Sequence, residues 1–138
     1  MTYVLRNIKD GDLEILLKDS TENGKVDTNV IKDSVEIKVM ECNGLPIMML
    51  GRVEYPTADL VLTTGVWGIF SKDIDKHAKS AVKFCKDLIF DRAGFKFMVL
   101  IDEGDEKFIR FVEFFGFHRT KFVEEKQGRV YHLYVKET

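Results

Sequence analysis

Residues 105–117 read DEKFIRFVEFFGF, and this stretch decides the fold. It predicts a helix from about Glu106 to Phe115 that ends at Gly116, because glycine readily takes the left-handed conformation that stops a helix. Asp105 fits the N-cap position, where a side-chain oxygen accepts one of the unpaired first amides. Taken alone, Gly116 and Phe117 would indicate only a helix stop and a core aromatic, so the interpretation depends on the order of the neighbouring elements.

A long helix and a strand precede this segment, and a hairpin follows it. The strand is predicted at Phe95–Asp102, and the hairpin at His118–Glu125 and Arg129–Lys136. The long helix begins near Ser71 or Asp73, either of which can cap it, and ends at Gly94. Its apolar stripe comprises Ile74, Ala78, Ala81, Val82, Cys85, Leu88 and Ile89, at three- and four-residue steps. A separate polar stripe comprises Lys72, Lys76, Lys79, Lys83 and Lys86.

Strands dominate the N-terminal half. In chain order the predicted elements are a strand at Tyr3–Leu5, a helix capped by the aspartates of Asp10-Gly11-Asp12, a helical turn at Asn29–Ser34, and strands at Val35–Met40, Leu45–Val53 and Leu60–Phe70. Alternation in the strand from Val35 indicates that one of its faces is buried. Asn43-Gly44 predicts a hairpin turn, since both residues tolerate positive φ. The last strand is expected to be interrupted near Thr63-Thr64-Gly65.

The composition is that of a globular protein and fits one domain over residues 1–138. Hydrophobic residues make up 45% and charged residues 32% of the chain, and the formal net charge is −2. A polyanion binder usually carries a basic excess, so this balance argues against nucleic acid. The longest apolar runs are far shorter than a membrane-spanning helix, and the first residues lack the apolar region of a secretory signal. Cys42 and Cys85 lie in apolar patterns and fit core positions, which favours a reducing, cytoplasmic location.

The order of elements resembles that of the GNAT acyltransferases, an α/β fold with a central mixed sheet flanked by helices. The segment 105–117 resembles the penultimate helix of that family, where a helix carrying IRF ends in Gly-Phe before the last strands. The resemblance implies that the strands ending near Phe70 and Asp102 run parallel and splay apart to accept acyl-CoA. The chain also resembles small GNAT-like proteins of tailed phages, in which a Trp-containing strand, here Val66-Trp67-Gly68-Ile69-Phe70, leads to a long basic helix. Some of those proteins are internal virion components.

The resemblance implies that acetyl-CoA, as co-substrate, lies against the start of the long helix and the start of the next one. The residues that it implies for cofactor binding are Ile69, Phe70, Ser71, Lys72, Lys76 and Asp105. The two spaced glycines of the family are missing before the long helix, and Asp73 and Asp75 would repel a phosphate. Ser71 can donate its hydroxyl, and Lys72 and Lys76, one helical turn apart, can neutralise phosphate charge. The lysines equally fit a solvated outer face, and both interpretations stay open.

The penultimate helix departs from the chemistry of the family at two positions. Asp105 stands where the family often has an Asn bonded to the pantetheine arm, and a carboxylate can accept a bond there but cannot donate one. Val112 stands where many members have the Tyr that protonates the leaving thiolate. Neither Val112 nor its neighbour Phe111 can give up a proton.

N-acyl transfer also needs a base that removes a proton from the incoming ammonium group. The candidates are Glu54, Asp59, His118, Tyr131 and His132, each of which also fits an ordinary surface or core role. The three histidines are too dispersed in the sequence for a metal site, and no phosphate-binding glycine loop occurs.

Two functions therefore stay open. The first is an acyl-CoA-dependent N-acyltransferase, acetyl-specific, that acts on a small amine or a protein amine. The second is a GNAT-shaped protein without catalysis that works as an interaction or virion component. Its partner would be a second copy of the chain, in a homodimer, or a virion protein. Direct nucleic-acid binding through the lysine stripe is a third and weaker hypothesis, which the near-neutral charge opposes. No membrane partner is expected.

Overall fold

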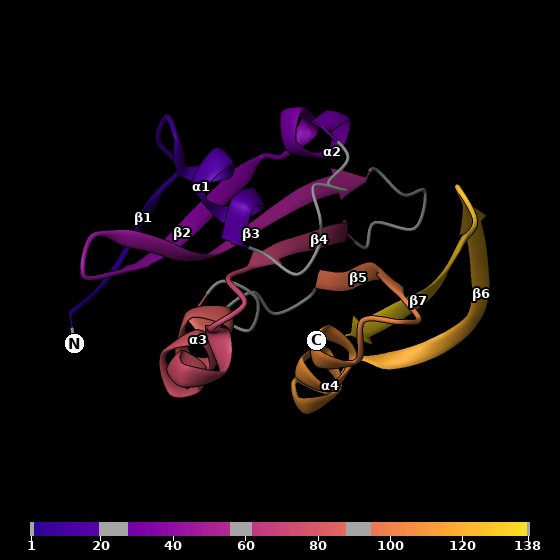
Figure 1. The fold of residues 1–138 in the computed structure, drawn as a ribbon. Helices are drawn as coiled ribbons and strands as arrows, with labels where there is room; N and C mark the ends of the chain where they lie inside the picture. Colours follow the sequence, from indigo (N-terminus) through magenta and orange to yellow (C-terminus); the bar gives the residue numbers. More distant parts are fainter. Residues whose placement is uncertain (1, 20–27, 56–61, 88–94, 138) are drawn as a thin grey trace. The chain divides into compact units, whose positions relative to one another are not determined.

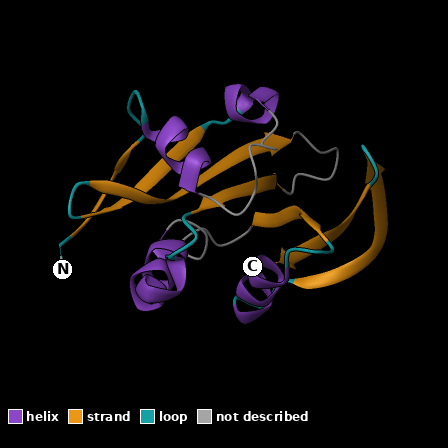
Figure 2. Ribbon diagram, viewed as in Figure 1, coloured by secondary structure: helices purple, strands orange, loops and turns teal. Residues whose placement is uncertain are grey.

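The computed structural model describes residues 2–19, 28–55, 62–87 and 95–137 (Figure 1). In chain order the elements are β1 (Tyr3–Asn7), α1 (Asp12–Asp19), α2 (Thr28–Asp33), β2 (Glu36–Cys42), β3 (Leu45–Tyr55), β4 (Leu62–Phe70), the 3₁₀ helix η1 (Ile74–His77), α3 (Ala78–Cys85), β5 (Phe95–Asp102), α4 (Glu106–Phe114), β6 (His118–Lys126) and β7 (Arg129–Glu137). The strands follow the order β1-β2-β3-β4-β5-β7-β6 in one sheet. β4 and β5 run parallel, whereas β1–β2, β2–β3, β5–β7 and β6–β7 are antiparallel pairs. The mixed sheet with its helices (Figure 2) confirms the predicted α/β fold class.

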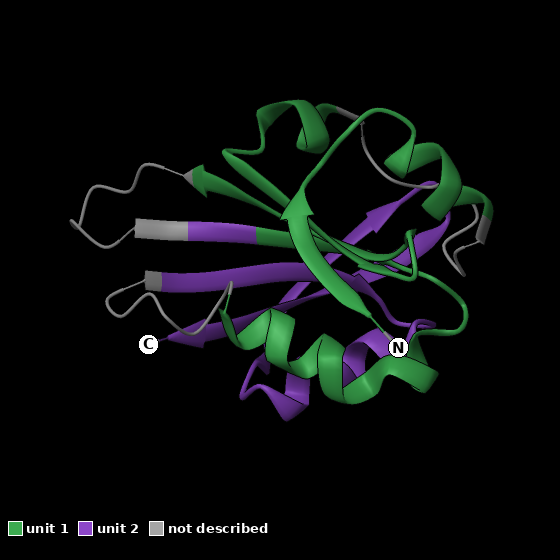
Figure 3. Cartoon of the chain, turned by 90° about the vertical axis from the view of Figure 1, so that its left-hand side faces the viewer, with its two compact units in different colours: residues 1–54, 66–92 green, residues 55–65, 93–138 purple. Residues whose placement is uncertain are grey.

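The chain forms two compact units, which Figure 3 shows in different colours. The first comprises residues 1–54 and 66–92, and the second comprises residues 55–65 and 93–138. The strand β4 contributes to both units. The single domain expected over residues 1–138 stays a prediction. In the described part of the chain, no helix is long and apolar enough to cross a membrane.

In the first unit, α1 covers one face of the strands. The buried cluster there comprises Leu16 on α1, Val39 on β2, Met49 on β3 and Ile69 on β4. Trp67 packs against this cluster, and its indole Nε1 donates a hydrogen bond of 2.8 Å to Ser34 Oγ. The ring lies over Gly51, where an added Cβ would be only 2.3 Å from Trp67 Cε2. The glycine therefore makes room for the largest side chain of this face.

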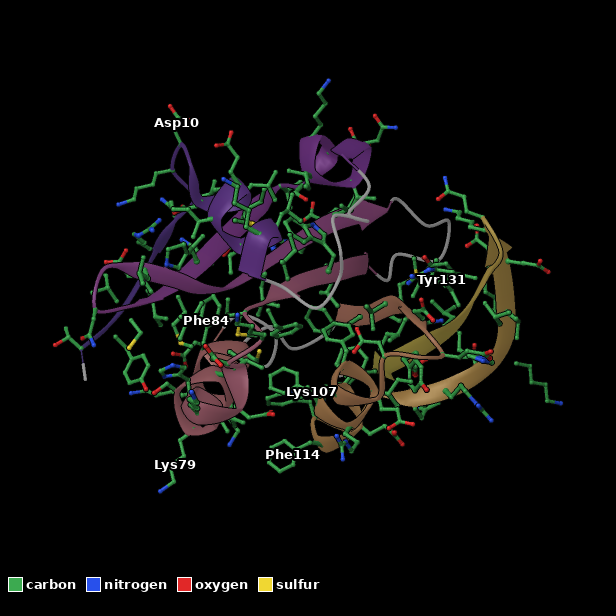
Figure 4. The ribbon with its side chains drawn as sticks, in the orientation of Figure 1. Asp10, Lys79, Phe84, Lys107, Phe114 and Tyr131 are labelled. Carbon is green, nitrogen blue, oxygen red and sulfur yellow. The ribbon has the colours of Figure 1, made fainter. Side chains whose placement is uncertain are left out.

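The opposite face of the same strands is buried as well. Met40 and Met48 are 0% exposed, although strand alternation directs them away from the α1 side. Figure 1 shows α3 on that side of the strands, opposite α1 and α2. In Figure 4 the Phe84 side chain of α3 is directed toward the strands and Lys79 is directed away from them. The expectation that β2 is buried on one face only is therefore wrong, because helices lie on both sides of it.

A buried carboxylate joins α1 to β1. Asp12 is 2% exposed and accepts two bonds from the Arg6 guanidinium, at 2.7 Å from Nη1 and 2.8 Å from Nη2. It also accepts the Lys9 amide at 2.8 Å, and Arg6 Nε donates to Glu41 on β2 at 2.7 Å. The hydrogen bond from Arg6 lowers the pKa of Asp12 although burial opposes this. Asp12 thus holds the chain that precedes α1, in place of the helix amides that it was expected to cap.

The strand β4 is continuous from Leu62 to Phe70, so the interruption predicted near Thr63-Thr64-Gly65 is wrong. Within the second unit, β4 and β5 pair in parallel from Leu62 opposite Phe95 to Gly65 opposite Met98. β4 then continues to Phe70 and β5 to Asp102. These two ends belong to different units, so their expected divergence stays a prediction.

The predicted long helix begins as a 3₁₀ turn. η1 precedes α3, and the Ser71 hydroxyl accepts the Asp73 amide at 3.3 Å ahead of both. The Asp73 side chain makes no capping bond. The bonded amide lies before the first residue of η1, so Ser71 closes a turn ahead of the helix, and Asp73 occupies the N-cap position without a side-chain bond; neither predicted capping bond is confirmed. The end predicted at Gly94 lies outside the described residues.

Two of the predicted chain reversals are confirmed by backbone angles. Asn43 and Gly44 have φ of 51° and 86° between β2 and β3, and Gly116 has φ of 90° after α4. The end of α4 is closed by Lys136 on β7, whose Nζ donates to the Phe115 carbonyl at 2.5 Å. A cation at this end also suits the negative end of the helix dipole.

Replacing Asp12 by Asn should lower the free energy of unfolding by about 3 kcal/mol, because it leaves a largely buried Arg6 with one carboxylate fewer. The pKa of Asp12 is lowered in the folded state. Its contribution to the free energy of unfolding is therefore complete above the ordinary carboxyl pKa of about 4, and it is lost as the pH falls through the pKa of the folded state. Urea unfolding at several pH values measures both effects. Asp10→Asn, at an exposed neighbour, is the matched control and should change stability by less than about 0.5 kcal/mol. Equal losses in the two variants would contradict the assignment.

Replacing Gly51 by Ala should destabilise the protein by about 1–3 kcal/mol, because the new methyl group overlaps the Trp67 ring. Trp67 is the single tryptophan of the chain, so its fluorescence reports the displacement directly. Gly104→Ala is the control, because a Cβ there would meet Asp102 Oδ1 at an ordinary 3.5 Å. An unchanged emission spectrum and melting temperature in Gly51→Ala would refute the close approach.

Candidate functional site

Ser71 holds the turn between β4 and η1. Its amide donates to the Ile47 carbonyl on β3 at 2.9 Å, and its carbonyl accepts the Ile74 amide at 3.0 Å. The Asp73 amide is bonded to the Ser71 hydroxyl, and the Lys76 amide donates to the Asp73 carbonyl at 3.0 Å. Amides at the start of a helix are the usual donors to a phosphate. Here those of Asp73, Ile74 and Lys76 are already bonded within the turn.

The positive charge of this turn lies at its surface. Lys72 and Lys76 are exposed, and Lys76 Nζ lies 3.6 Å from Asp73 Oδ1. The Lys76 side chain is 74% exposed, so solvent screens this ion pair and it holds the ammonium weakly. All five lysines of the predicted polar stripe are exposed, which confirms that they form a solvated face. A contact of Lys72 or Lys76 with CoA stays a prediction.

The two residues that end β4 differ in what they can offer a ligand. Ile69 is fully buried in the α1 cluster, so only its backbone is available. Phe70 is half-buried on the other side of the strand, where its ring lies over Gly68 at 3.1 Å from a Cβ added there. The glycine again leaves room for an aromatic ring.

In the second unit, Asp105 caps α4, as predicted. Its Oδ1 accepts the Phe108 amide at 3.2 Å, and burial raises the pKa of its carboxyl. Val112, at the position of the missing Tyr, is buried, and Phe111 stacks edge-on against Phe115 with ring centroids 5.0 Å apart. Both side chains therefore belong to the packing of α4.

The turn after β5 gathers polar groups that sequence reasoning missed. Asp102 accepts the Gly104 amide at 2.9 Å through Oδ1 and the Arg129 guanidinium at 2.8 Å through Oδ2. Next to it, Glu103 Oε2 lies 3.3 Å from His132 Nε2. Antiparallel pairing places Ile101 opposite His132 and so brings β7 beside the end of β5. No local pattern in the sequence links Glu103 to His132; only the register of β5 and β7 brings them together.

The candidate bases fall in different places. Glu54 on β3 accepts Arg52 Nη1 at 2.6 Å, so its carboxylate is already paired. His118 is exposed at the start of β6, and Tyr131 is half-buried on β7 opposite Asp102. Asp59 lies outside the described residues. Of the five candidates, the structure brings Tyr131 and His132 to the turn after β5.

Two further kinds of chemistry find no support in the described residues. No three His, Cys, Asp or Glu side chains gather there as a metal ion would require. Cys42 and Cys85 are buried free thiols, as predicted, and burial raises the pKa of Cys85 far above its usual value. A thiol that stays protonated is a poor nucleophile, so Cys85 has a packing role.

The predicted cofactor residues also divide between the two units. Ile69, Phe70, Ser71, Lys72 and Lys76 form one continuous segment of the first unit, whereas Asp105 belongs to the second. Within the first group Ile69 and Ser71 are buried and Phe70 is half-buried, so Lys72 and Lys76 are its exposed members, and they define the candidate ligand surface at the end of β4 and the start of η1.

Neither protein-family models nor curated proteins match this chain. Several solved structures match it over almost its whole length. Naa50 from Arabidopsis thaliana, in complex with the bisubstrate analogue CoA-Ac-MVNAL, is 12% identical with 100% of both chains covered and a TM-score of 0.74. A chain of the NatC complex bound to Gag peptide and CoA is 14% identical, with coverage of 100% and 99% and a TM-score of 0.77. A GNAT family acetyltransferase from Elizabethkingia anophelis with acetyl-CoA bound is 12% identical, with coverage of 99% and 98% and a TM-score of 0.61.

Structural matches at such low sequence identity show the fold but do not show which reaction the protein catalyses. The parallel β4–β5 pair, the crossover through α3 and the final β6–β7 hairpin agree with the element order expected from the sequence. This chain has the fold of the GNAT N-acetyltransferases.

Proposed function

We propose that the protein is an acyl-CoA-dependent N-acyltransferase that uses acetyl-CoA as co-substrate and an amine, free or on a protein, as acceptor. The observation that carries the proposal is the agreement of fold over almost the whole chain with acetyltransferases, some solved with CoA or acetyl-CoA bound. The two free, buried thiols suit a reducing, cytoplasmic location for this activity.

The phosphates of CoA would be held chiefly by side chains. Lys72 and Lys76 are exposed next to the end of β4, and each can place an ammonium on a phosphate oxygen. The amides of the same turn are bonded internally, so they contribute less than in a glycine-rich turn. The hydrogen-bond donors of this turn thus fit an anion, but fewer of them are backbone amides than in a glycine-rich turn.

The reaction needs an unprotonated amine, a polarised thioester carbonyl and a proton for the leaving thiolate. Val112 cannot supply that proton, so the thiolate would take it from water or from a group outside α4. The thiol of CoA is acidic enough to leave as the anion, which makes a dedicated acid dispensable.

A second candidate is a GNAT-shaped protein without catalysis, acting through a partner protein, including the virion role implied by the phage resemblance. Two observations favour it, namely the internally bonded amides after Ser71 and the buried Val112. Acetyl transfer by the purified protein to any member of a broad amine panel would rule it out.

Acetyl-CoA should raise the melting temperature at sub-millimolar concentration, because a ligand that binds only the folded state stabilises it. The double variant Lys72→Glu/Lys76→Glu should weaken this binding at least about tenfold, since two attractive charges become repulsive. Differential scanning fluorimetry and calorimetric titration measure the two effects.

The control is Lys79→Glu/Lys83→Glu, which makes the same charge change further along the exposed stripe. Pantetheine, which lacks the phosphates of CoA, serves as a second probe whose binding should not distinguish the two double variants. Absence of any acetyl-CoA effect on the wild-type melting temperature would contradict the proposed function. Equal weakening of acetyl-CoA binding in both double variants would contradict the role of Lys72 and Lys76 but would leave the proposed function standing.

A further inference from the structure

We propose that His132, oriented by Glu103, is the general base that takes the proton from the acceptor ammonium group. This inference rests on the proposed acyl transfer and adds to it a residue pair in the second unit. It stands on the position of the two side chains at the carboxyl end of β5, one of the strands of the parallel pair.

The turn that presents Glu103 is fixed by neighbouring bonds. The Asp102 carbonyl accepts the Asp105 amide at 2.9 Å, while its carboxylate holds the Gly104 amide and Arg129. The Glu103 amide itself donates to the Val130 carbonyl on β7 at 3.0 Å. These bonds hold the backbone of Glu103 beside Val130, which lies two residues before His132 on β7.

The contact defines the tautomer of the imidazole. A carboxylate can only accept a hydrogen bond, so His132 Nε2, 3.3 Å from Glu103 Oε2, is the nitrogen that carries hydrogen. In the neutral ring Nδ1 then holds the lone pair that can take a proton. The Glu103 carboxylate orients the ring, as the third group does in other arrangements of a base and its orienting residue.

Exposure suits the two partners to different tasks. The His132 side chain is 16% exposed, so its ring is largely held in place by its surroundings. The Glu103 side chain is 60% exposed and in contact with water. The imidazole is thus held by its surroundings, and its carboxylate partner is open to solvent.

Other charged groups around the pair are already engaged or lie further along the strands. Asp102 on β5 is paired with Arg129 on β7, and Asp105 caps α4. On β6, Val123 stands opposite His132, and Glu125 follows two residues later on the same side of that strand. Glu103 is therefore the carboxylate in direct contact with the ring.

The step balances without a further reactant. His132 Nδ1 accepts a proton from R–NH₃⁺, and the freed amine attacks the thioester carbonyl. The C–N bond forms and the C–S bond breaks, so the electron pair of that bond leaves on the CoA thiolate. The acylated nitrogen loses a second proton, which the CoA thiolate takes by way of water, and the proton on His132 passes to water beside Glu103.

The pair also compares well with the other candidate bases. Glu54 accepts a hydrogen bond from Arg52, so its carboxylate is already engaged in an ion pair on its own strand. His118 is exposed at the start of β6, where its backbone pairs with Val135 of β7. Among the described candidates, His132 alone combines a basic nitrogen with an orienting carboxylate.

The test uses the full chain, acetyl-CoA, and primary amines that are protonated at neutral pH, namely spermidine and peptides with a free N-terminus. CoA release gives kcat/KM. His132→Gln should lower it about 100-fold or more, the usual worth of a general base, and leave the acetyl-CoA melting shift unchanged. Glu103→Gln should lower kcat with KM for acetyl-CoA unchanged, and Glu103→Asp should restore part of the loss. Glu106→Gln, at an exposed carboxylate three residues later, is the matched control.

Two further readouts separate a base from a packing residue. Added imidazole should restore activity to His132→Ala, and circular dichroism checks that this variant is folded. Hydroxylamine is unprotonated at neutral pH and needs no base, so His132→Gln should lose far less activity with it than with the alkyl amines.

The outcomes distinguish the two proposals. Wild-type kcat/KM in His132→Gln, or an equal loss with hydroxylamine and with spermidine, would overturn the role of His132 and leave acyl transfer standing. Absence of transfer by the wild-type protein to every amine tested would overturn the proposed function and the base with it.

Discussion

The parallel pairing of β4 with β5 is the constraint on which the rest of the structure depends. Parallel neighbours begin at the same end of a sheet, so the chain must return along its whole length before Phe95 can pair beside Leu62. The return runs through η1 and α3, and α3 must bury an apolar face to be stable, which Ala81, Phe84 and Cys85 supply. The same crossover places the Ser71 turn directly at the carboxyl end of β4. The candidate ligand surface of the first unit is therefore a consequence of the strand order.

Much of this fold follows from patterns that are local in the sequence. Asn43-Gly44 and Gly116 predict the reversals that the backbone adopts, because few residues tolerate positive φ. The failures have non-local causes. Met40 looks like the exposed side of a half-buried strand, yet it is fully buried, and α3 lies on that side of the strands (Figure 1). Thr63-Thr64-Gly65 looks like a break, yet pairing with β5 keeps it extended.

The candidate site was harder to predict, because residue type says little about partners. Charge alone makes Lys76 and Glu54 candidates, and the structure pairs each with an opposite charge close by in the chain: Lys76 with Asp73 just before η1, and Glu54 with Arg52 on β3. The contact between Glu103 and His132 depends on which residue of β7 stands opposite the end of β5. That register is set by the packing of two strands that are separated in the sequence by α4 and β6. No spacing rule within the sequence encodes it.

In the proposed enzyme, the turn after β4 would also determine how acyl-CoA is recognised. A phosphate cradle of backbone amides is rigid and little affected by salt, whereas exposed lysines contribute about 1 kcal/mol or less each and are screened over about 10 Å at ordinary ionic strength. Here the amides of Asp73, Ile74 and Lys76 serve the turn itself, so the phosphates depend on the weaker kind of contact. The remaining affinity must then come from the part of the ligand that carries no charge, the pantetheine arm and the acyl group. The proposed enzyme would therefore hold its co-substrate mainly by that neutral part, and binding would change less with salt than the lysine stripe suggests.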